Sequence, residues 1–529
     1  MVGSDPCVLF AGALSCEFVD IPTRFNLTAH LLDRHLHDGH ASDLAVISGD
    51  QHLTYQTITA LVDRTASGLR SLGLLPEQRC LIVLPDSPEF IAAYLGAIKT
   101  GAVAVPTSTA LRTADYAYFL EESGARIAIV HSSLWAEFGP ALAINPATAV
   151  VCGDPVEGAL HWDTWLRAAS AGFDPAPTHK DDAAFWLWTS GSTGRPKAAV
   201  HTHQDWVHCC ESYARGVLGI TAADITFSSS KLFHAYGLGN GLVFPFHVGA
   251  TTVLHAGRPQ PRTVLDTITA QRPTLFFSVP TLYAAMLNEL DQGYPCAFDS
   301  IRLAASAAEP LPAAIYQRWR DRTGVEILDG IGSTEVLHIY LSARAGRVRP
   351  GSTGQAVPGY ELRIVDGEGA PVPPGTIGDL LVAGPSTALS YWHRADLTRD
   401  RMRGRWFFTG DKYSIDEDGY YWYAGRSDDM FRVSGQWLSP AEVEAALIEH
   451  PLVLEAAVIA HQEETQLHTP AAFVVLKDGT AGTPELVREL QDFVKSRITP
   501  YKYPRRITFL PELPKSAAGK LLRYKLREL

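Results

Sequence analysis

The feature that most restricts the possible folds is a regular alternation of helical and strand-like segments near the start of the chain. Helical periodicity covers residues 55–72, 88–100 and 114–123, and short apolar runs typical of buried strands cover residues 80–84, 102–105 and 126–130. Such an alternation is typical of an α/β fold with helices packed on a mostly parallel sheet.

The pattern changes twice further along the chain. Residues 359–423 are rich in strand-like segments with Gly and Pro turns. After residue 428, a capping box from Ser439 to Glu442 predicts a helix that ends near His450, followed by strands over 455–460 and 472–476 and a helix over 484–498. We therefore predict an α/β fold in which a large N-terminal domain of layered, mostly parallel sheets covers residues 1–427. It includes a β-rich subdomain at about 359–427, and a small α+β C-terminal domain covers residues 428–529.

Composition narrows the class of protein. A chain of 529 residues is longer than one hydrophobic core usually supports, which agrees with several domains. The net charge of −12 argues against a nucleic-acid partner, because neutralising phosphates requires a concentrated basic face. We expect no membrane span, since no apolar run reaches about 18 residues, and we expect a cytoplasmic protein because no signal peptide is evident. The seven cysteines form no CxxC pair and are expected to be reduced, mostly buried thiols.

The sharpest motif is Thr189-Ser-Gly-Ser-Thr-Gly-Arg-Pro-Lys197, which follows an apolar strand over 184–188. Small residues let backbone N–H groups and hydroxyls approach a phosphate closely, and Arg195 and Lys197 add positive charge. The motif is not the P-loop pattern, because Gly191 and Gly194 are too close together and no Ser or Thr follows Lys197.

This motif resembles the phosphate loop of the superfamily that contains acyl-CoA synthetases, peptide-synthetase adenylation domains and firefly luciferase. Four further motifs occur in the order typical of that superfamily: Gly330-Ile-Gly-Ser-Thr-Glu335, Trp406-Phe-Phe-Thr-Gly-Asp411, Gly425-Arg-Ser-Asp-Asp429 and Pro514-Lys-Ser-Ala-Ala-Gly-Lys520. The resemblance implies that the chain forms an acyl-adenylate from ATP, with Mg²⁺, and then transfers the acyl group to a thiol.

The resemblance also implies roles for single residues in adenylation. Glu335 would hold Mg²⁺, Thr334 would contact the α-phosphate, and Lys520 would bridge the carboxylate and the α-phosphate. Asp411 would accept hydrogen bonds from the ribose hydroxyls, with Arg426 nearby. The full set of residues expected to bind ATP or AMP is Thr189, Ser190, Gly191, Ser192, Thr193, Gly194, Lys197, Asp329, Gly330, Ile331, Gly332, Ser333, Asp411 and Arg426.

For the thiol step, the resemblance implies a mobile C-terminal domain that turns about Asp428 after the first half-reaction. Gly435 and Ser434 would then line the passage for the pantetheine arm, where the missing side chain of glycine permits close approach. His234 resembles the residue that gates the thiol tunnel.

The acid is expected to be aromatic. Adenylation domains for amino acids place an Asp where this chain has Ala235, so an α-amino acid is not expected. The segments 231–240 and 330–339 are similar to those of benzoate-CoA ligases, and the implied acid pocket is lined by Ala235, Tyr236, Ala307, Gly332 and His338. Benzoate, or a 2-amino- or hydroxybenzoate, is the expected substrate. Two residues depart from the family wording: Ala308 replaces a usual Gly, with an extra methyl expected near the ring site, and Ser390 replaces the Gly of Gly-Tyr-Trp.

Several alternatives stay open. Coenzyme A is the expected acceptor, because Lys520 is followed by only nine residues and no fused carrier domain. A stand-alone enzyme that loads an aryl group onto a separate carrier protein would share every motif. A luciferase-like oxygenase and a catalytically silent homologue are further classes, and the intact Lys520 and Glu335 argue against the silent form. Homodimers occur in this family, but no segment marks an interface.

Overall fold

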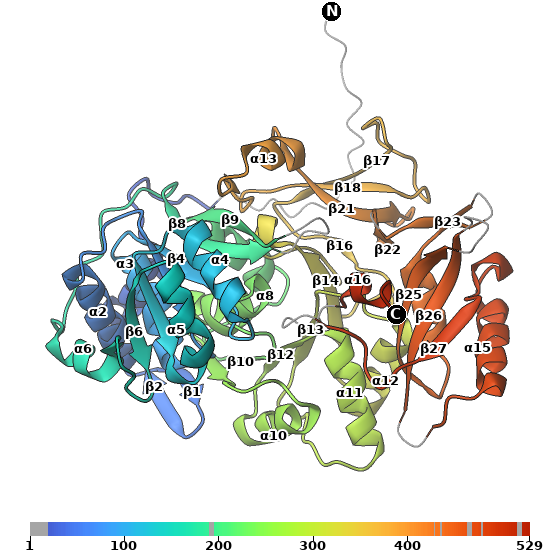
Figure 1. Cartoon of the computed structure of the whole chain (residues 1–529), viewed down its shortest axis with the longest axis horizontal. Helices are drawn as coiled ribbons and strands as arrows, with labels where there is room; N and C mark the ends of the chain where they lie inside the picture. Colours follow the sequence, from blue (N-terminus) through green and yellow to red (C-terminus); the bar gives the residue numbers. More distant parts are fainter. Residues whose placement is uncertain are drawn as a thin grey trace, which may run out of the picture.

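The structure is a computed structural model that describes residues 19–189, 195–427, 429–433, 436–462, 468–477, 480–515 and 521–529. Two large sheets lie side by side, a smaller antiparallel sheet lies above them, and the C-terminal part packs at one end (Figure 1). Within the described residues, no helix is both long enough and apolar enough to cross a membrane.

The first large sheet contains the alternation read from the sequence. Its described strands number eight, and five of them, β4–β3–β5–β6–β7 in sheet order, run parallel to their neighbours. The strands are β3 (Arg79–Val83), β4 (Val103–Pro106), β5 (Ile127–His131), β6 (Thr148–Cys152), β7 (Leu160–His161), β8 (Ala183–Thr189), β9 (Lys197–Thr202) and β19 (Ser390–Tyr391). The helices that connect or cover them are α2 (Tyr55–Ser71), α3 (Pro88–Lys99), α4 (Thr113–Ser123), α5 (Trp135–Ile144) and α6 (Trp162–Ala168). The predicted helices and strands of this region are confirmed to within two residues.

The second large sheet has nine described strands, and its centre is again parallel. Its strands are β1 (Leu44–Ser48), β2 (Gln51–Thr54), β10 (Ile225–Ser228), β11 (Thr251–Leu254), β12 (Leu275–Ser278), β13 (Leu303–Ser306), β14 (Ile327–Gly332), β15 (Ile339–Ser342) and β16 (Gln355–Ala356). Its outer helices are α10 (Pro261–Gln271), α11 (Pro280–Asp291) and α12 (Ala313–Thr323).

Helix α3 explains why the two sheets can share one core. Ser87 caps it by accepting a hydrogen bond from the Phe90 N–H, Pro88 takes the first turn, and every residue from Pro88 to Lys99 except Glu89 is buried. One hydrophobic cluster joins this helix to both sheets, while separate clusters cover the outer face of each sheet. A helix that is apolar on all sides needs such a place between layers, and the predicted layered α/β fold is confirmed.

The β-rich region forms a small antiparallel sheet in which β17–β18–β21–β20 are neighbours and β22 pairs with β21. Its strands are β17 (Glu361–Val365), β18 (Gly378–Ala383), β20 (Met402–Arg403), β21 (Trp406–Ile415) and β22 (Tyr421–Arg426). The short helix α13 (Ala395–Arg401) in this region was not expected from the sequence.

The C-terminal part has its own hydrophobic cluster around Leu438, Leu447, Val458, Val474 and Leu490. Its elements are β23 (Phe431–Val433), β24 (Gln436–Leu438), α14 (Pro440–Ile448), β25 (Val453–Gln462), β26 (His468–Leu476), α15 (Pro484–Arg497), β27 (Arg506–Phe509) and α16 (Arg523–Leu526). The Ser439 side chain accepts a hydrogen bond from the Glu442 N–H, as the capping box predicts. The predicted αββα order was incomplete, because β27 adds a third strand parallel to β26. The limits of the domains, at residues 427 and 428, stay a prediction.

Candidate active site

The predicted phosphate loop connects two antiparallel strands of the first large sheet. Thr189 ends β8, Lys197 begins β9, and the two residues are register partners. The Tyr118 hydroxyl donates a hydrogen bond to the Pro196 carbonyl oxygen at 2.7 Å, and the Arg195 guanidinium lies 5.1 Å from the centre of the Tyr118 ring. Residues 190–194 lie outside the described residues. The fold thus fixes both ends of the loop, and the loop's contacts with phosphate stay a prediction.

Tyr391 lies between Glu335 and Lys197, at the end of this loop. The Tyr391 hydroxyl donates a hydrogen bond to Oε1 of Glu335 at 2.7 Å, and the Lys197 ammonium lies 5.3 Å from the centre of the Tyr391 ring. Burial lowers the pKa of Lys197, while the charge of Glu335 opposes that shift. Among the described residues, the only side-chain hydrogen bond to the Glu335 carboxylate is this one at Oε1. A carboxylate beside a partly desolvated ammonium is suited to a phosphate–metal complex.

Hydrogen bonds hold in place the segment that carries Thr334 and Glu335. Ser333 caps the 3₁₀ turn Thr334–Val336 by accepting a hydrogen bond from the Val336 N–H. Nε2 of His201 lies 2.8 Å from the Thr334 carbonyl oxygen, and Nδ1 of the same ring lies 2.9 Å from Oδ2 of Asp205. Both side chains are buried. His201, which the sequence did not single out, therefore fixes the turn that presents Thr334.

Asp411 and Arg426 form the second predicted pair. They are register partners on β21 and β22, and an Arg426 N–H donates to Oδ1 of Asp411 at 3.1 Å. Gly410 just before has φ +78°, and a Cβ there would lie 3.1 Å from the Arg426 guanidinium. The Thr-Gly turn of the motif is therefore required by both backbone conformation and close approach.

Tyr340 joins these pairs electrostatically. Its hydroxyl is buried without a hydrogen-bond partner among the described residues. Burial raises its pKa well above the ordinary value, and the charges of Asp411, Arg426 and Glu335 all act on it. Glu335, the predicted metal ligand, and Asp411 and Arg426, the predicted ribose residues, thus all lie close enough to Tyr340 for their charges to act on it.

The predicted acid pocket is built around His338. Its ring stacks on Tyr236 with centroids 5.7 Å apart and meets Phe244 edge-on at 4.6 Å, and Tyr213 and Trp206 lie further round it. Burial lowers the pKa of His338 to about 3, so the imidazole is neutral at physiological pH. Its Nδ1 has no hydrogen-bond partner among the described residues. Aromatic walls with a free polar atom suit a flat ring that carries a polar group.

Two glycines make room for His338, one beside its ring and one beside its backbone. A Cβ on Gly239 would lie 2.6 Å from Cδ2 of His338, and a Cβ on Gly332 would lie 2.5 Å from its carbonyl oxygen. Ala235 begins the short helix Ala235–Leu238, which also carries Tyr236. The structure therefore brings the predicted residues Ala235, Tyr236, Gly332 and His338 together.

The last four residues of β14 were all predicted to bind the nucleotide, and one of them, Gly332, was also predicted to line the acid pocket. Asp329, Gly330, Ile331 and Gly332 end β14, and Asp329 is the register partner of Ser306 at the end of β13. Burial raises the pKa of Asp329 well above its ordinary value. Oδ1 of Asp329 and the Ser306 hydroxyl are both buried without a hydrogen-bond partner among the described residues. Buried polar groups are normally paired, so these atoms indicate a place for a ligand.

The segment after Ser306 shows the structural effect of one departure from the family motif. Ala307 is 2% exposed, as expected for a pocket wall. Ala308 has φ +74°, a conformation that favours glycine. The alanine that replaces the usual Gly therefore strains the backbone. Ser390 causes no such strain, because it lies in β19 and pairs with Val200 in an antiparallel register.

His234 is half-buried beside the Phe233 ring, and the burial of its ring lowers its pKa to about 4. No described contact joins it to the other predicted residues, although its Nε2 has no hydrogen-bond partner among them. Asp428, Ser434, Gly435 and Lys520 lie outside the described residues, so their roles stay predictions.

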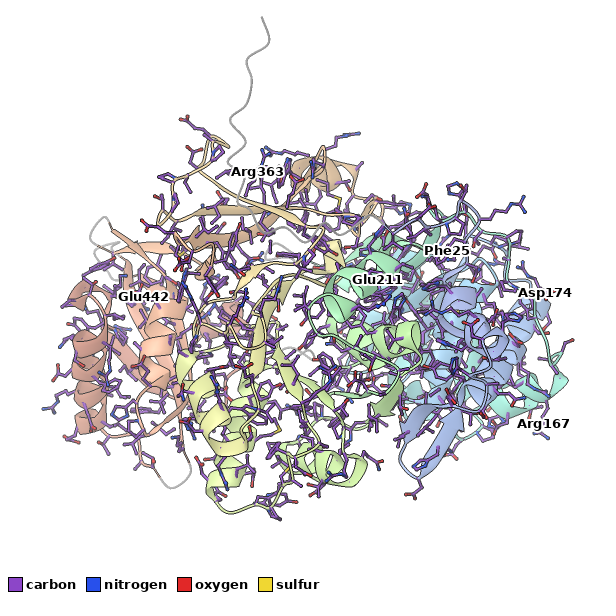
Figure 2. The ribbon with its side chains drawn as sticks, turned by 180° about the vertical axis from the view of Figure 1, so that it is seen from behind. Phe25, Arg167, Asp174, Glu211, Arg363 and Glu442 are labelled. Atoms are coloured by element: carbon purple, nitrogen blue, oxygen red, sulfur yellow. The ribbon has the colours of Figure 1, made fainter. Side chains whose placement is uncertain are left out.

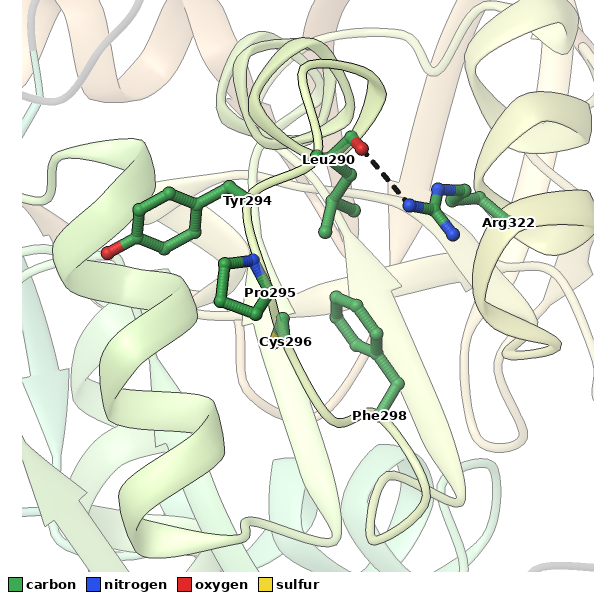
Figure 3. Close-up of a pocket in the computed structure, with 7 residues that line it drawn as sticks. Leu290, Tyr294, Pro295, Cys296, Phe298 and Arg322 are labelled. Atoms are coloured by element: carbon green, nitrogen blue, oxygen red, sulfur yellow. Dashed lines mark hydrogen bonds between the residues drawn. The ribbon is translucent and has the colours of Figure 1, made fainter.

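A separate pocket lies at the end of α11 and contains no predicted site residue (Figure 3). It is lined by Leu290, Gly293, Tyr294, Pro295, Cys296, Phe298 and Arg322.

Comparison with known families assigns the chain to a family. The family model described as AMP-binding enzyme matches residues 33–392, and the model described as AMP-binding enzyme C-terminal domain matches residues 442–520. The chain therefore belongs to the AMP-binding enzyme family.

Particular relatives are similar over almost the whole chain. The chain is 46% identical over 516 residues to a benzoate–CoA ligase of Thauera aromatica, which covers 96% of this chain and 97% of that protein. It is 41% identical over 508 residues to a 4-hydroxybenzoate–CoA/benzoate–CoA ligase of Rhodopseudomonas palustris, with 96% and 94% covered.

Solved structures are also similar. A crystal structure of an anthranilate CoA ligase in complex with anthranoyl-AMP has a TM-score of 0.92 at 40% identity, with 96% of this chain and 98% of that chain covered. A benzoate CoA ligase from Burkholderia xenovorans LB400 has a TM-score of 0.89 at 43% identity, with 95% and 100% covered. The resemblance inferred from the motifs is confirmed.

Proposed function

We propose that this protein is an AMP-forming acid–thiol ligase that activates benzoate or a substituted benzoate, such as 2-aminobenzoate, and transfers it to coenzyme A. The observation that carries the proposal is the aromatic pocket of Tyr236 and His338, in which His338 follows Glu335 by three residues. Its unpaired polar atoms suit an aromatic acid better than an aliphatic chain. The names of the relatives point to the same class of substrate.

In the first half-reaction, an oxygen of the carboxylate attacks the α-phosphorus of ATP and pyrophosphate leaves. The charge that concentrates on the α-phosphate is stabilised by Lys520 and by Thr334, which His201 holds in place. Lys197 and the loop 189–194 would bind the outer phosphates, while Asp411 would accept hydrogen bonds from the ribose.

The residues present fit a magnesium ion. Among the described residues, the only side-chain hydrogen bond to the Glu335 carboxylate is at Oε1, the residue is only 8% exposed, and phosphate oxygens and water would complete the octahedral oxygen set that Mg²⁺ prefers. Bound there, Mg²⁺ would offset negative charge on the phosphates.

In the second half-reaction, the thiol of coenzyme A attacks the acyl carbon and AMP leaves. We assign the passage of the pantetheine arm to Ser434 and Gly435 and the gate to His234. This assignment requires the C-terminal domain, residues 428–529, to turn about Asp428 between the two steps. A cytoplasmic location and a homodimer stay predictions.

The proposal is tested by incubating the protein with ATP, Mg²⁺, coenzyme A and a panel of benzoates, aminobenzoates, cinnamates and fatty acids. Mass spectrometry should detect AMP and one or more aryl-CoA thioesters. Adenylate without a CoA product would instead support loading of a separate carrier protein. Exclusive turnover of fatty acids would contradict the aryl pocket.

The role of Lys520 gives a sharper prediction. Lys520→Ala should slow adenylation about 10²–10³-fold, the usual loss for one electrostatic contact in a transition state. Pyrophosphate exchange measures this step, and thioester formation from supplied aryl-adenylate should survive. A parallel loss of both steps would contradict the proposal that different faces of the C-terminal domain serve the two steps.

A further inference from the structure

A carboxylate of the large domain meets the C-terminal part next to the segment that contains Lys520. Oε1 of Glu309 accepts a hydrogen bond from the Leu521 N–H at 3.4 Å, and Oε2 accepts one from the Thr281 hydroxyl at 2.9 Å. Thr281 lies in the first turn of α11, which runs beside β25 of the C-terminal part (Figure 1). One carboxylate therefore joins an element of the large domain to the residue that follows Lys520.

The other end of the same segment lies close by. Lys515 and Leu521 form an isolated antiparallel bridge, so the positions on either side of residues 516–520 are held together. Lys515 makes an ion pair with Glu455 at 2.7 Å, and its charge also acts on Glu309. Burial raises the pKa of Glu309, and the Thr281 hydroxyl, Lys515 and the Leu521 N–H oppose that shift. The carboxylate is thus partly withdrawn from water at a junction where Lys515 favours its charged form.

Backbone strain is present at the position that aims this carboxylate. Ala308, the residue before Glu309, has φ +74°, a conformation that strains a non-glycine residue, and Pro310 restricts the chain on the other side. Strained residues persist where the surrounding structure requires them, and they cluster at functional sites. Ala307, one residue further back, is a predicted wall of the acid pocket. The same short segment therefore reaches from the acid pocket to the C-terminal part.

We propose that Glu309 is a positioning residue for adenylation, which anchors the chain on either side of the Lys520 segment to the large domain while the acyl-adenylate forms. The inference rests on the proposed function, because it assigns Lys520 to the first half-reaction alone. Glu309 releases Leu521 when the C-terminal domain turns, so the thioester step does not depend on it.

The test separates the two half-reactions in Glu309→Gln, which keeps the size of the side chain and removes its charge. Pyrophosphate exchange with benzoate should fall about 10-fold, the loss expected for one hydrogen bond to a charged acceptor. Thioester formation from supplied benzoyl-adenylate should stay within about twofold of the wild type. Glu485→Gln is the matched control, since Glu485 is 76% exposed on α15 of the same C-terminal part.

A second measurement does not depend on activity. Amide hydrogen exchange at Leu521 should become faster in Glu309→Gln than in the wild type and in Glu485→Gln, because the N–H loses a charged acceptor. Unchanged exchange at Leu521, or an equal loss of both half-reactions in Glu309→Gln, would overturn the anchor. A wild-type protein that forms neither adenylate nor thioester would instead overturn the proposed function, so the two failures are distinguishable.

Discussion

Two buried groups of polar side chains in the large domain differ in how well their hydrogen bonds are satisfied. Around the acid pocket, polar atoms of Tyr236, Asn240, Ser306, Asp329 and His338 are buried without regular hydrogen bonds among the described residues. The Asn240 amide is nevertheless close enough to Tyr236 to affect its pKa. Each such atom costs free energy in the absence of a ligand.

A second group of buried polar side chains in the same domain forms ion pairs and hydrogen bonds. The Lys99 ammonium lies 2.8 Å from Asp33 and also contacts Asp63, although its side chain is only 2% exposed. Nearby, His247 connects His30 at 3.1 Å to Glu211 at 2.7 Å. Glu211 lies in the lobe opposite the C-terminal part that carries Glu442 (Figure 2). The paired groups around Lys99 and His247 support the fold, whereas the group of unpaired polar atoms at the acid pocket indicates a place for a ligand. A single unpaired atom is not enough for that conclusion, because Arg34, Trp165 and Trp319 also carry buried nitrogens without a partner among the described residues.

The largest expected effect belongs to the paired group. Lys99→Met removes the cation from between Asp33 and Asp63, which leaves two carboxylates facing each other at 17% exposure. We expect a loss of about 3 kcal/mol in the free energy of unfolding, measured by urea denaturation. Activity per folded molecule should not change. A loss below about 0.5 kcal/mol, typical of a surface substitution, would break the comparison.

The next effect concerns His338. Because its folded-state pKa is about 3 and its unfolded value is about 6.5, the unfolded state binds the proton first as the pH falls. Stability is therefore lost below pH 6.5, and at pH 5 this residue alone should account for about 2 kcal/mol. His338→Asn should show a smaller difference between pH 7 and pH 5 in urea denaturation. His52→Asn, at an exposed position, is the control. Equal differences in wild type and His338→Asn would contradict a neutral buried ring.

The smallest effect separates two tyrosines. Tyr236→Phe removes a hydroxyl without a regular hydrogen bond, so stability should change little, while the KM for the acid should rise about 5–10-fold if the hydroxyl binds the ligand. Tyr55→Phe removes a hydroxyl that donates to the Ala250 carbonyl oxygen at 2.7 Å, and should lower stability by about 1 kcal/mol without changing KM. The comparison would fail if Tyr236→Phe lowered stability more than Tyr55→Phe.

Much of this architecture could be predicted because it depends on local signals. The apolar strands, the Ser439 cap and the Thr-Gly turn before Asp411 each depend on a short stretch of sequence. The motifs also gave the pairs Asp411–Arg426 and Tyr236–His338, which the structure brings together.

Contacts between distant segments could not be predicted in the same way. Tyr391 reaches Glu335 across 56 positions, and His201 reaches Thr334 across 133. The only signal for Tyr391 was its place in a degenerate Gly-Tyr-Trp motif. Strand β27 was missed because four residues alternate too briefly to show a period. The strained φ of Ala308 depends on packing, which local sequence patterns do not report.

The pairing of Asp411 with Arg426 has a consequence for regulation of the cycle. Arg426 ends β22, and position 428, the proposed pivot, follows two residues later. A nucleotide that hydrogen-bonds to Asp411 would therefore act on the strand that leads into the pivot. If the nucleotide favours one orientation of the C-terminal domain, a substitution that favours the same orientation should also raise the affinity for nucleotide. A measurement of nucleotide affinity would in that case report on the orientation of the C-terminal domain.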